Sequence, residues 1–299
     1  MFFLVLLSIA PAIFWFWFLF QGKEIKILSL KLLLKVFFFG LFLALVAMFI
    51  ETKVFSFLPF NYFFTLSGEE LFVGDLKMPI FIFLLTFFFI APLEEFLKYL
   101  FLRREIFKVK EIDRVIEGIQ LGIVLGLGFA TIENSFYFVR AGSNVLTLAS
   151  LFYFRFFLST LAHVIYSGML GYYLALAKFH KLYQGFFLKR GLITVILLHG
   201  FFNFSLLTQA FSYTIGVVII AFVVLMKWMI DRRDFETYII KKKLPISAPL
   251  FSSKTEIDTF LTKEKFSFGE IKALSFCPRC LSIKKVGERT CPYCGMRFD

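Results

Sequence analysis

Seven apolar segments, each about as long as a bilayer is thick, constrain the fold of this 299-residue chain. An α-helix rises about 1.5 Å per residue, so roughly 20 apolar residues cross the hydrocarbon. Because 59% of the residues are hydrophobic and 47 are Phe, a soluble protein of this length could not bury its apolar side chains. The sequence therefore predicts an all-α polytopic membrane protein with about seven transmembrane helices, at residues 2–20, 29–50, 79–102, 115–139, 158–177, 191–209 and 212–230.

Two of the apolar regions need separate treatment. The first segment has no basic start and is too long for the apolar core of a cleaved signal, so we expect a retained anchor. Residues 145–157 are apolar but short and contain Arg155, so an eighth helix or a re-entrant helix is left open.

Basic residues predict the orientation of the spans. Lys and Arg cluster after the first, third and fifth segments, whereas the opposite loops hold only Lys53, Lys77, Arg140 and Arg155. By the positive-inside rule the N-terminus is outside the cell membrane, the C-terminal tail is cytoplasmic, and residues 51–78 and 141–157 lie outside. The net charge of +12 is explained by these loops, so nucleic acid is not an expected partner.

The chain divides into a membrane domain and a polar tail. Residues 1–230 form the membrane domain, with a catalytic core at about 79–209; 231–275 form a juxtamembrane linker, and 276–299 a small cytosolic domain. This last domain holds all four cysteines in two CxxC pairs, the spacing of a structural zinc ribbon: Cys277, Cys280, Cys291 and Cys294. Such a ribbon could bind a cytosolic protein partner.

Polar side chains inside four of the apolar segments are the candidate functional residues. Ionisable groups persist in hydrocarbon only where they face a protein interior or a wet cavity. The group comprises Glu94 and Glu95, with Lys98 one turn further on, then Glu133, His163, His199 and Asn203. Glutamate and histidine can activate a water, and neighbouring donors can stabilise an oxyanion, so this set predicts a hydrolytic site between helices. Glycines 118, 122, 126 and 128 are interpreted as close helix packing.

The same residues could also bind a catalytic divalent metal. His163, His199 and one or more of the glutamates are ligand types that a catalytic zinc accepts. The HExxH motif is absent, so the sequence leaves open whether the water is activated by metal or by glutamate.

Four strings of residues, in order, resemble the PrsW intramembrane proteases, relatives of the CAAX prenyl endopeptidase and bacteriocin-processing superfamily. They are EEFLK at 94–98, GFATIEN at 128–134, RFFLSTLAHVIYSG at 155–168 and HGFFN at 199–203. The resemblance implies an endopeptidase acting on membrane-associated or lipidated proteins, such as single-span anti-sigma factors. It also implies Glu94 as the water-activating base with Glu95 as its partner. Glu133 stands where the wider superfamily has His, and His163, His199 and Asn203 complete the acid and oxyanion side.

Three expectations remain open at this stage. Glu94 lies toward the cytoplasmic end of its segment and Glu133 late in a segment running outward, so they meet only if a helix is broken, tilted or longer than the bilayer. The buried Glu and His groups would also suit a proton-coupled transporter or channel. A catalytically inactive scaffold, with polar groups that only join helices, is the third reading.

Overall fold

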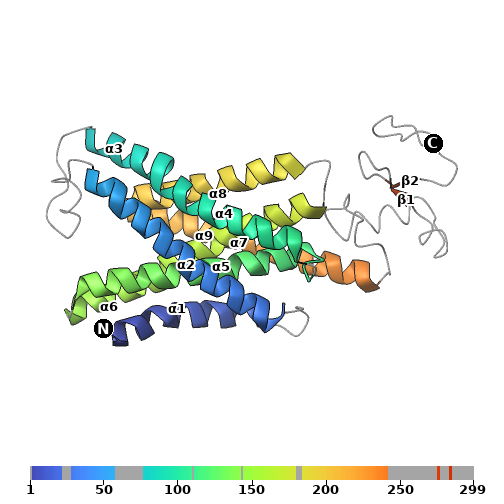
Figure 1. The fold of residues 1–299 in the computed structure, drawn as a ribbon, viewed down its shortest axis with the longest axis horizontal. Coiled ribbons are helices and arrows are strands. Elements are labelled where there is room, and N and C mark those ends of the chain that lie inside the picture. The colour runs from blue at the N-terminus through green and yellow to red at the C-terminus, as the bar shows by residue number, and fades with distance from the viewer. Residues whose placement is uncertain are drawn as a thin grey trace.

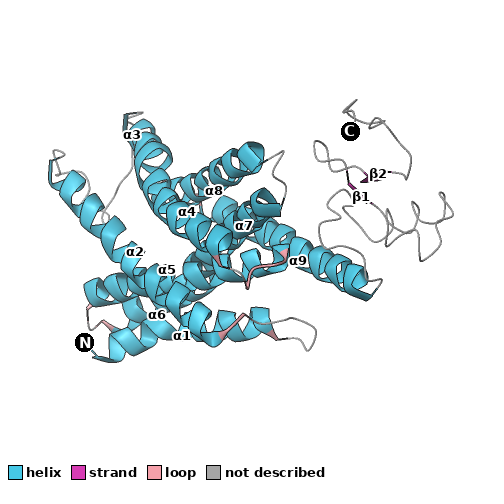
Figure 2. Cartoon of the chain, turned by 45° about the vertical axis from the view of Figure 1, so that its right-hand side comes forward, coloured by secondary structure: helices cyan, strands magenta, loops and turns pink. Residues whose placement is uncertain are grey.

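The computed structural model describes residues 2–21, 28–57, 77–109, 111–142, 144–179 and 184–241, and two short strands near the C-terminus. The described chain up to residue 241 is helical (Figures 1 and 2). The elements are α1 (Phe2–Phe20), α2 (Leu30–Phe57), α3 (Lys77–Leu85), η3 (Thr86–Ile90), α4 (Ala91–Lys108), α5 (Val115–Ala141), α6 (Val145–Phe154), η4 (Arg155–Ser159), α7 (Thr160–Phe179), α8 (Gln184–Leu207) and α9 (Phe211–Lys241), where η marks a π-helical turn.

Six helical stretches of the described residues are long and apolar enough to cross a membrane, which confirms a multi-pass membrane protein. They are Leu30–Ser56, Pro79–Lys108, Val115–Ala141, Val145–Phe179, Gln184–Leu207 and Phe211–Asp231. The first expected span is helix α1, in which Leu6–Phe20 is apolar but shorter than these six. Large apolar side chains such as Phe38, Phe49 and Phe88 are exposed on the outer faces, as contact with lipid requires.

Helix α5 lies at the centre of the bundle. Its apolar window is 94% buried, against 28–33% for the other five spans. It packs most extensively on α7 and α2, and Figure 1 shows α2 crossing it obliquely. Residues of α5 therefore face protein on nearly every side, which allows polar groups to be placed on it at membrane depth.

The glycines of α5 allow this close packing, as the sequence predicts. A Cβ added at Gly122 would lie 1.9 Å from the backbone oxygen of Ser167 in α7, and one at Gly128 would lie 2.2 Å from the backbone oxygen of Phe37 in α2. Only the absence of a side chain lets the backbones approach so closely.

A network of hydrogen bonds fixes the turn between α4 and α5. The carboxylate of Glu117 accepts hydrogen bonds from the backbone N–H groups of Asp113 and Arg114, which caps the start of α5. From α7, the Lys178 ammonium donates to the carbonyls of Val109 and Ile112 at 3.2 and 2.7 Å. These contacts set the register of α4 and α5 against α7, the helices that carry most of the polar side chains.

Residues 145–157, for which the sequence left an extra helix open, are helical and continue directly into α7, so that α6, η4 and α7 make one stretch, Val145–Phe179. Arg155 accordingly is buried, at 6% exposure, instead of lying in a loop. Its charge is tolerated at this depth because acidic and amide groups of α5 surround it.

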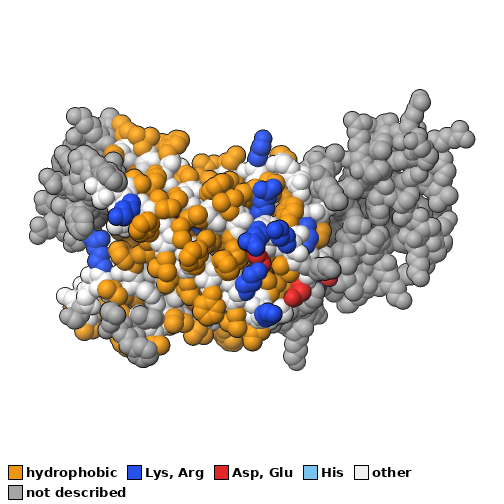
Figure 3. All heavy atoms as spheres, viewed as in Figure 1, with side chains coloured by type: hydrophobic (Ala, Val, Ile, Leu, Met, Phe, Trp, Pro, Cys, Tyr) orange, Lys and Arg blue, Asp and Glu red, His pale blue; other side chains and the backbone are white. Residues whose placement is uncertain are grey.

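Charged residues gather toward the ends of the bundle. Figure 3 shows apolar side chains over the middle of one face and a group of Lys and Arg side chains toward one end. Arg103, Arg104 and Lys108 near the end of α4 are exposed, matching the basic loop that the sequence places after the third segment.

The cysteine-rich tail lies largely outside the described residues. Strands β1 (Ser275–Phe276) and β2 (Ile283–Lys284) pair antiparallel on either side of the first CxxC pair in the sequence. All four cysteines of the predicted zinc ribbon, like the linker after residue 241, fall outside the described ranges.

Candidate active site

Helix α4 places two carboxylates and an ammonium group in the protein interior. Glu94 is 3% exposed, and Glu95 and Lys98 are fully buried. Because α4 continues beyond the expected end at 102, Glu94 lies near the middle of the stretch Pro79–Lys108. Lys98 Nζ donates a hydrogen bond of 2.8 Å to Glu95 Oε1 and lies 3.8 Å from Glu94 Oε2. The negative charge of the two glutamates is thus partly neutralised by Lys98, a residue of the same helix.

His199 of α8 contacts both glutamates. Its Nδ1 lies 2.8 Å from Glu95 Oε1, and its Nε2 lies 4.0 Å from Glu94 Oε2. A carboxylate paired with Lys98 can only accept, so Nδ1 of His199 carries a proton and donates it. In the neutral ring the lone pair of Nε2 then faces Glu94. Tyr166 of α7 stacks on the imidazole, with ring centroids 5.5 Å apart, and holds its plane.

His163 of α7 is held between α4 and α5. Its Nδ1 lies 3.1 Å from Lys98 Nζ and its Nε2 lies 2.6 Å from Glu133 Oε2. An ammonium has only donors, so Nδ1 accepts, and the ring proton sits on Nε2 and is donated to Glu133. The ring is therefore neutral with a fixed tautomer.

Glu133 joins the same cluster. Glu94 and Glu133, which the sequence put at different depths, are therefore brought together. Arg155 Nη2 donates to Glu133 Oε2 at 2.9 Å, and its Nε donates to Asn134 Oδ1. The Asn134 amide in turn donates to the Thr160 hydroxyl at 3.0 Å. The depth conflict disappears because α4 extends past the expected span to Lys108, which moves Glu94 to the middle of its helical stretch.

Each of the two π-helical turns lies just before a site residue. Turn η3 ends at Ile90, four residues before Glu94, and η4 ends at Ser159, four residues before His163. In η3 the Thr86 hydroxyl donates to the Ile82 carbonyl at 2.8 Å, which satisfies a backbone oxygen. A π-turn inserts an extra residue into a helix and changes which side chains face inward, and such turns are frequent at functional sites.

Comparison with known proteins agrees with this arrangement. A family model described as "PrsW family intramembrane metalloprotease" matches residues 29–229. The chain belongs to the PrsW family of intramembrane proteases. It is 30% identical to the Protease PrsW of Shouchella clausii over 227 residues, covering 76% of this chain and 93% of that protein. The Protease PrsW of Oceanobacillus iheyensis is 32% identical over 199 residues (67% and 79%), and that of Bacillus subtilis 26% over 207 residues (69% and 84%). No solved structure matches this chain significantly.

The PrsW membership confirms the resemblance drawn from the motifs, and with it a membrane protease. The family match ends at residue 229, before the cysteine-rich tail begins. The site lies wholly inside the matched region, on helices α2, α4, α5, α7 and α8.

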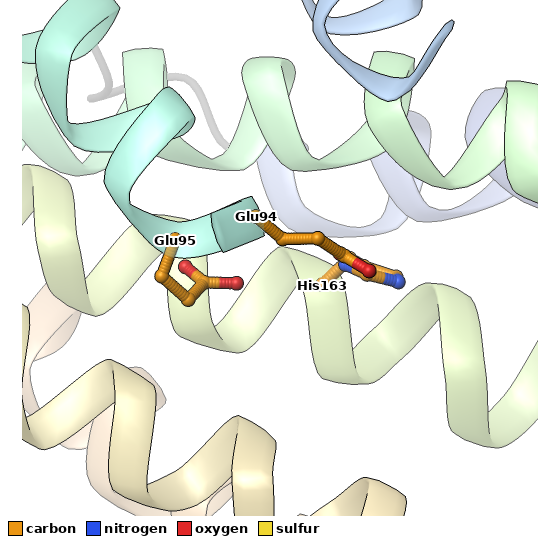
Figure 4. A group of neighbouring side chains, drawn as sticks. All are labelled: Glu94, Glu95 and His163. Atoms are coloured by element: carbon orange, nitrogen blue, oxygen red, sulfur yellow. The ribbon is translucent and has the colours of Figure 1, made fainter. Parts of the chain in front are cut away.

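The family is described as metalloproteases, and three site residues fit a metal by donor type. Glu94, Glu95 and His163 each offer one ligand atom, and these atoms lie within 4.8 Å of one another. Figure 4 shows the two glutamates leaving α4 with His163 reaching them from α7. Two carboxylates and an imidazole suit zinc and similar ions. Oε2 of Glu94 and Oε2 of Glu95 have no hydrogen-bond partner among the described residues, so both have free lone pairs.

Asn203 is the one predicted site residue that the structure does not join to the cluster. It lies one turn after His199 on α8, and its half-buried side chain makes no hydrogen bond to the described part of the chain. It remains within reach of the same face of α8, so a role toward substrate stays a prediction.

Sequence reasoning missed Glu51 and did not include Arg155 among the site residues. The Glu51 carboxyl of α2 interacts with that of Glu94, and its Oε1 is buried without a partner among the described residues. Glu51 was assigned to an outside loop because it directly follows the second apolar segment. The only available signal was that a helix can continue past its apolar stretch, as α2 does to Phe57.

Proposed function

We propose that this PrsW-family protease hydrolyses a peptide bond of a membrane-associated protein, using a water held between Glu94 and His199. The observation that carries the proposal is the gap of 4.0 Å between Glu94 Oε2 and His199 Nε2. Two hydrogen bonds of about 2.8 Å that meet at one water span about 4 to 5 Å between their outer atoms. Both atoms are acceptors, so they take the two protons of one water and leave its lone pairs free to attack.

The reaction follows from this placement. The water oxygen attacks the substrate carbonyl carbon while Glu94 takes one water proton as general base. The carbonyl oxygen becomes an oxyanion, for which Asn203 on the same face of α8 is the candidate donor. When the carbon–nitrogen bond breaks, Glu94 returns the proton to the leaving nitrogen. The water thus supplies its hydroxyl to one product and its proton to the other.

The remaining site residues position Glu94 and His199. Glu95 accepts from His199 Nδ1 and Lys98 at 2.8 Å each, which directs Nε2 of His199 toward Glu94. Glu133 fixes His163, and Arg155 fixes Glu133. The steps above use only the chain's own groups.

The depth of the site supports a class of substrate. Glu94 lies near the middle of a helical stretch of 30 residues, surrounded by other apolar helices. A scissile bond can reach it only in a chain that enters the membrane, such as a single-span protein of the anti-sigma-factor type or a lipidated protein. A helical substrate must also unwind locally, because its amide bonds are otherwise shielded by the helix.

We further propose the orientation and the role of the tail. The basic loops support an orientation in the cell membrane with the N-terminus outside and the C-terminus in the cytoplasm. The four cysteines then lie in a reducing compartment, which supports a structural zinc in a ribbon that recruits a cytosolic protein or substrate.

The experiment is cleavage of a co-expressed single-span anti-sigma factor, followed by immunoblotting. Glu94→Gln and His199→Ala are expected to stop cleavage while the protein still accumulates in the membrane. Glu105→Gln is the matched control, because Glu105 is a glutamate of the same helix with 4% exposure that pairs with Lys35 outside the site. Cleavage by both site variants at the rate of the Glu105 variant would show that the assigned site is wrong.

A further inference from the structure

The Lys98 ammonium lies beside all three residues that would bind a metal. It is 2.8 Å from Glu95 Oε1, 3.1 Å from His163 Nδ1 and 3.8 Å from Glu94 Oε2. Glu94, Glu95 and His163 are the residues that the described part of the chain offers as a metal-binding group. A positive charge from the chain itself therefore already stands at the place where a cation would be bound.

The groups around Lys98 stabilise a buried cation. The side chain is fully buried, and its ammonium also lies 4.0 Å from the centroid of the Phe129 ring in α5. Aromatic faces attract cations, the more so away from water. The ammonium has three N–H groups. One is matched by the Glu95 carboxylate, one by the His163 ring nitrogen, and the third by Glu94 or the face of Phe129.

The contact distances at Lys98 are those of an ammonium and not those of a bound metal. Zinc binds nitrogen and oxygen ligands at about 2.0–2.2 Å. The distances of 2.8, 3.1 and 3.8 Å from Lys98 Nζ are those of hydrogen bonds and an ion pair. Moreover, the lone pair of His163 Nδ1 is taken up by Lys98, because Nε2 of that ring bonds Glu133. A metal would have to displace the ammonium to reach this nitrogen.

We propose that Lys98 is a tethered cation that takes the place of a metal between Glu94, Glu95 and His163. In this role Lys98 is a positioning residue: it holds the two helices α4 and α7 together at the site and keeps divalent ions out of it. The inference rests on the site proposed above. The role of Lys98 is tested by metal binding and the proposed function by cleavage, so a failure of one proposal can be distinguished from a failure of the other.

The test measures metal binding to the full-length protein in detergent. The four tail cysteines are changed to Ser, so that thiolates do not contribute, and Co²⁺ is titrated with its visible absorption and the metal content after dialysis as readouts. This background should retain no Co²⁺ at the site. Adding Lys98→Met should create a site for one Co²⁺, bound at least about tenfold more tightly, because a like charge has been removed. Lys98→Arg keeps the charge and should behave as the background does.

Two results would overturn the proposal. One is that Lys98→Met gains no affinity for Co²⁺ over the background although it remains folded. The other needs no variant of Lys98: if the cysteine-free protein itself holds one Co²⁺, and His163→Ala abolishes that binding, then a metal coexists with the ammonium. The second result remains decisive even if Lys98→Met does not fold.

Discussion

Oε2 of Glu94 lies 4.0 Å from Nε2 of His199 and has no hydrogen-bond partner among the described residues, whereas Oε1 of the adjacent Glu95 bonds both Lys98 and His199. The two neighbouring carboxylates therefore differ in their hydrogen-bond partners. The oxygen of Glu94 is buried but unpartnered among the described residues, and that of Glu95 holds Lys98 and His199 in place. Their substitution should separate catalysis from stability.

Glu94→Gln should leave the free energy of unfolding within about 1 kcal/mol of the parent, because few contacts of that oxygen are lost. Glu95→Gln should lower it by about 2 to 4 kcal/mol, because Lys98 loses its buried ion pair. Thermal or denaturant unfolding in detergent measures both values, and cleavage of a membrane substrate measures activity. Equal destabilisation by the two substitutions would contradict this division of roles.

A second prediction concerns the contact between Glu51 and Glu94. Two carboxyl groups that interact in the protein interior need a proton or a cation between them. In Glu51→Gln the amide N–H can donate to Glu94 instead, so the melting temperature should equal or exceed that of the parent. Glu51→Leu offers no donor and should melt at a lower temperature. If Glu51→Gln lowers the melting temperature as much as Glu51→Leu, the contact is not a carboxyl pair.

Hydropathy and residue type were enough to predict the spans and most of the site. Apolar stretches of about 20 residues mark helices that lipid requires, and an ionisable group inside one is expensive enough to indicate a site. Glu94, Glu95, Glu133, His163 and His199 were found in this way, and the structure brings all five together.

The missed features depend on how helices extend and rotate. Glu51 and Arg155 lie just outside the apolar stretches, on helices that continue past them, so hydropathy assigned both to loops. Turns η3 and η4 insert a residue before Glu94 and His163, and no sequence period signals such a change. The hydrogen-bond partner of each histidine nitrogen depends on contacts between four helices. A single sequence does not contain these contacts.

A third prediction concerns Arg155, which bonds Glu133 and Asn134 and lies 4.1 Å from the centroid of the Tyr137 ring. Arg155→Met should lower the free energy of unfolding by about 3 kcal/mol, because the Glu133 carboxylate loses its cationic partner and keeps only the hydrogen bond from His163. Adding Glu133→Gln removes that charge, so the double variant should be more stable than Arg155→Met alone. A double-mutant cycle in detergent measures this coupling, and additive effects would mean that the two residues act independently.

A fourth prediction concerns the packing of α5 on α7 behind the site. A methyl group at Gly122 would lie 1.9 Å from the Ser167 backbone oxygen, and backbone cannot move aside as a flexible side chain can. Gly122→Ala should therefore push α5 away from α7, lower the free energy of unfolding by more than about 2 kcal/mol and reduce cleavage, because Glu133 and His163 sit on these two helices. Gly216→Ala in α9 is the matched control, since nothing lies within 4 Å of the added carbon. There the gain in helix propensity should leave stability unchanged or slightly raised. If Gly122→Ala proves as harmless as Gly216→Ala, then the close contact between α5 and α7 does not hold the site together.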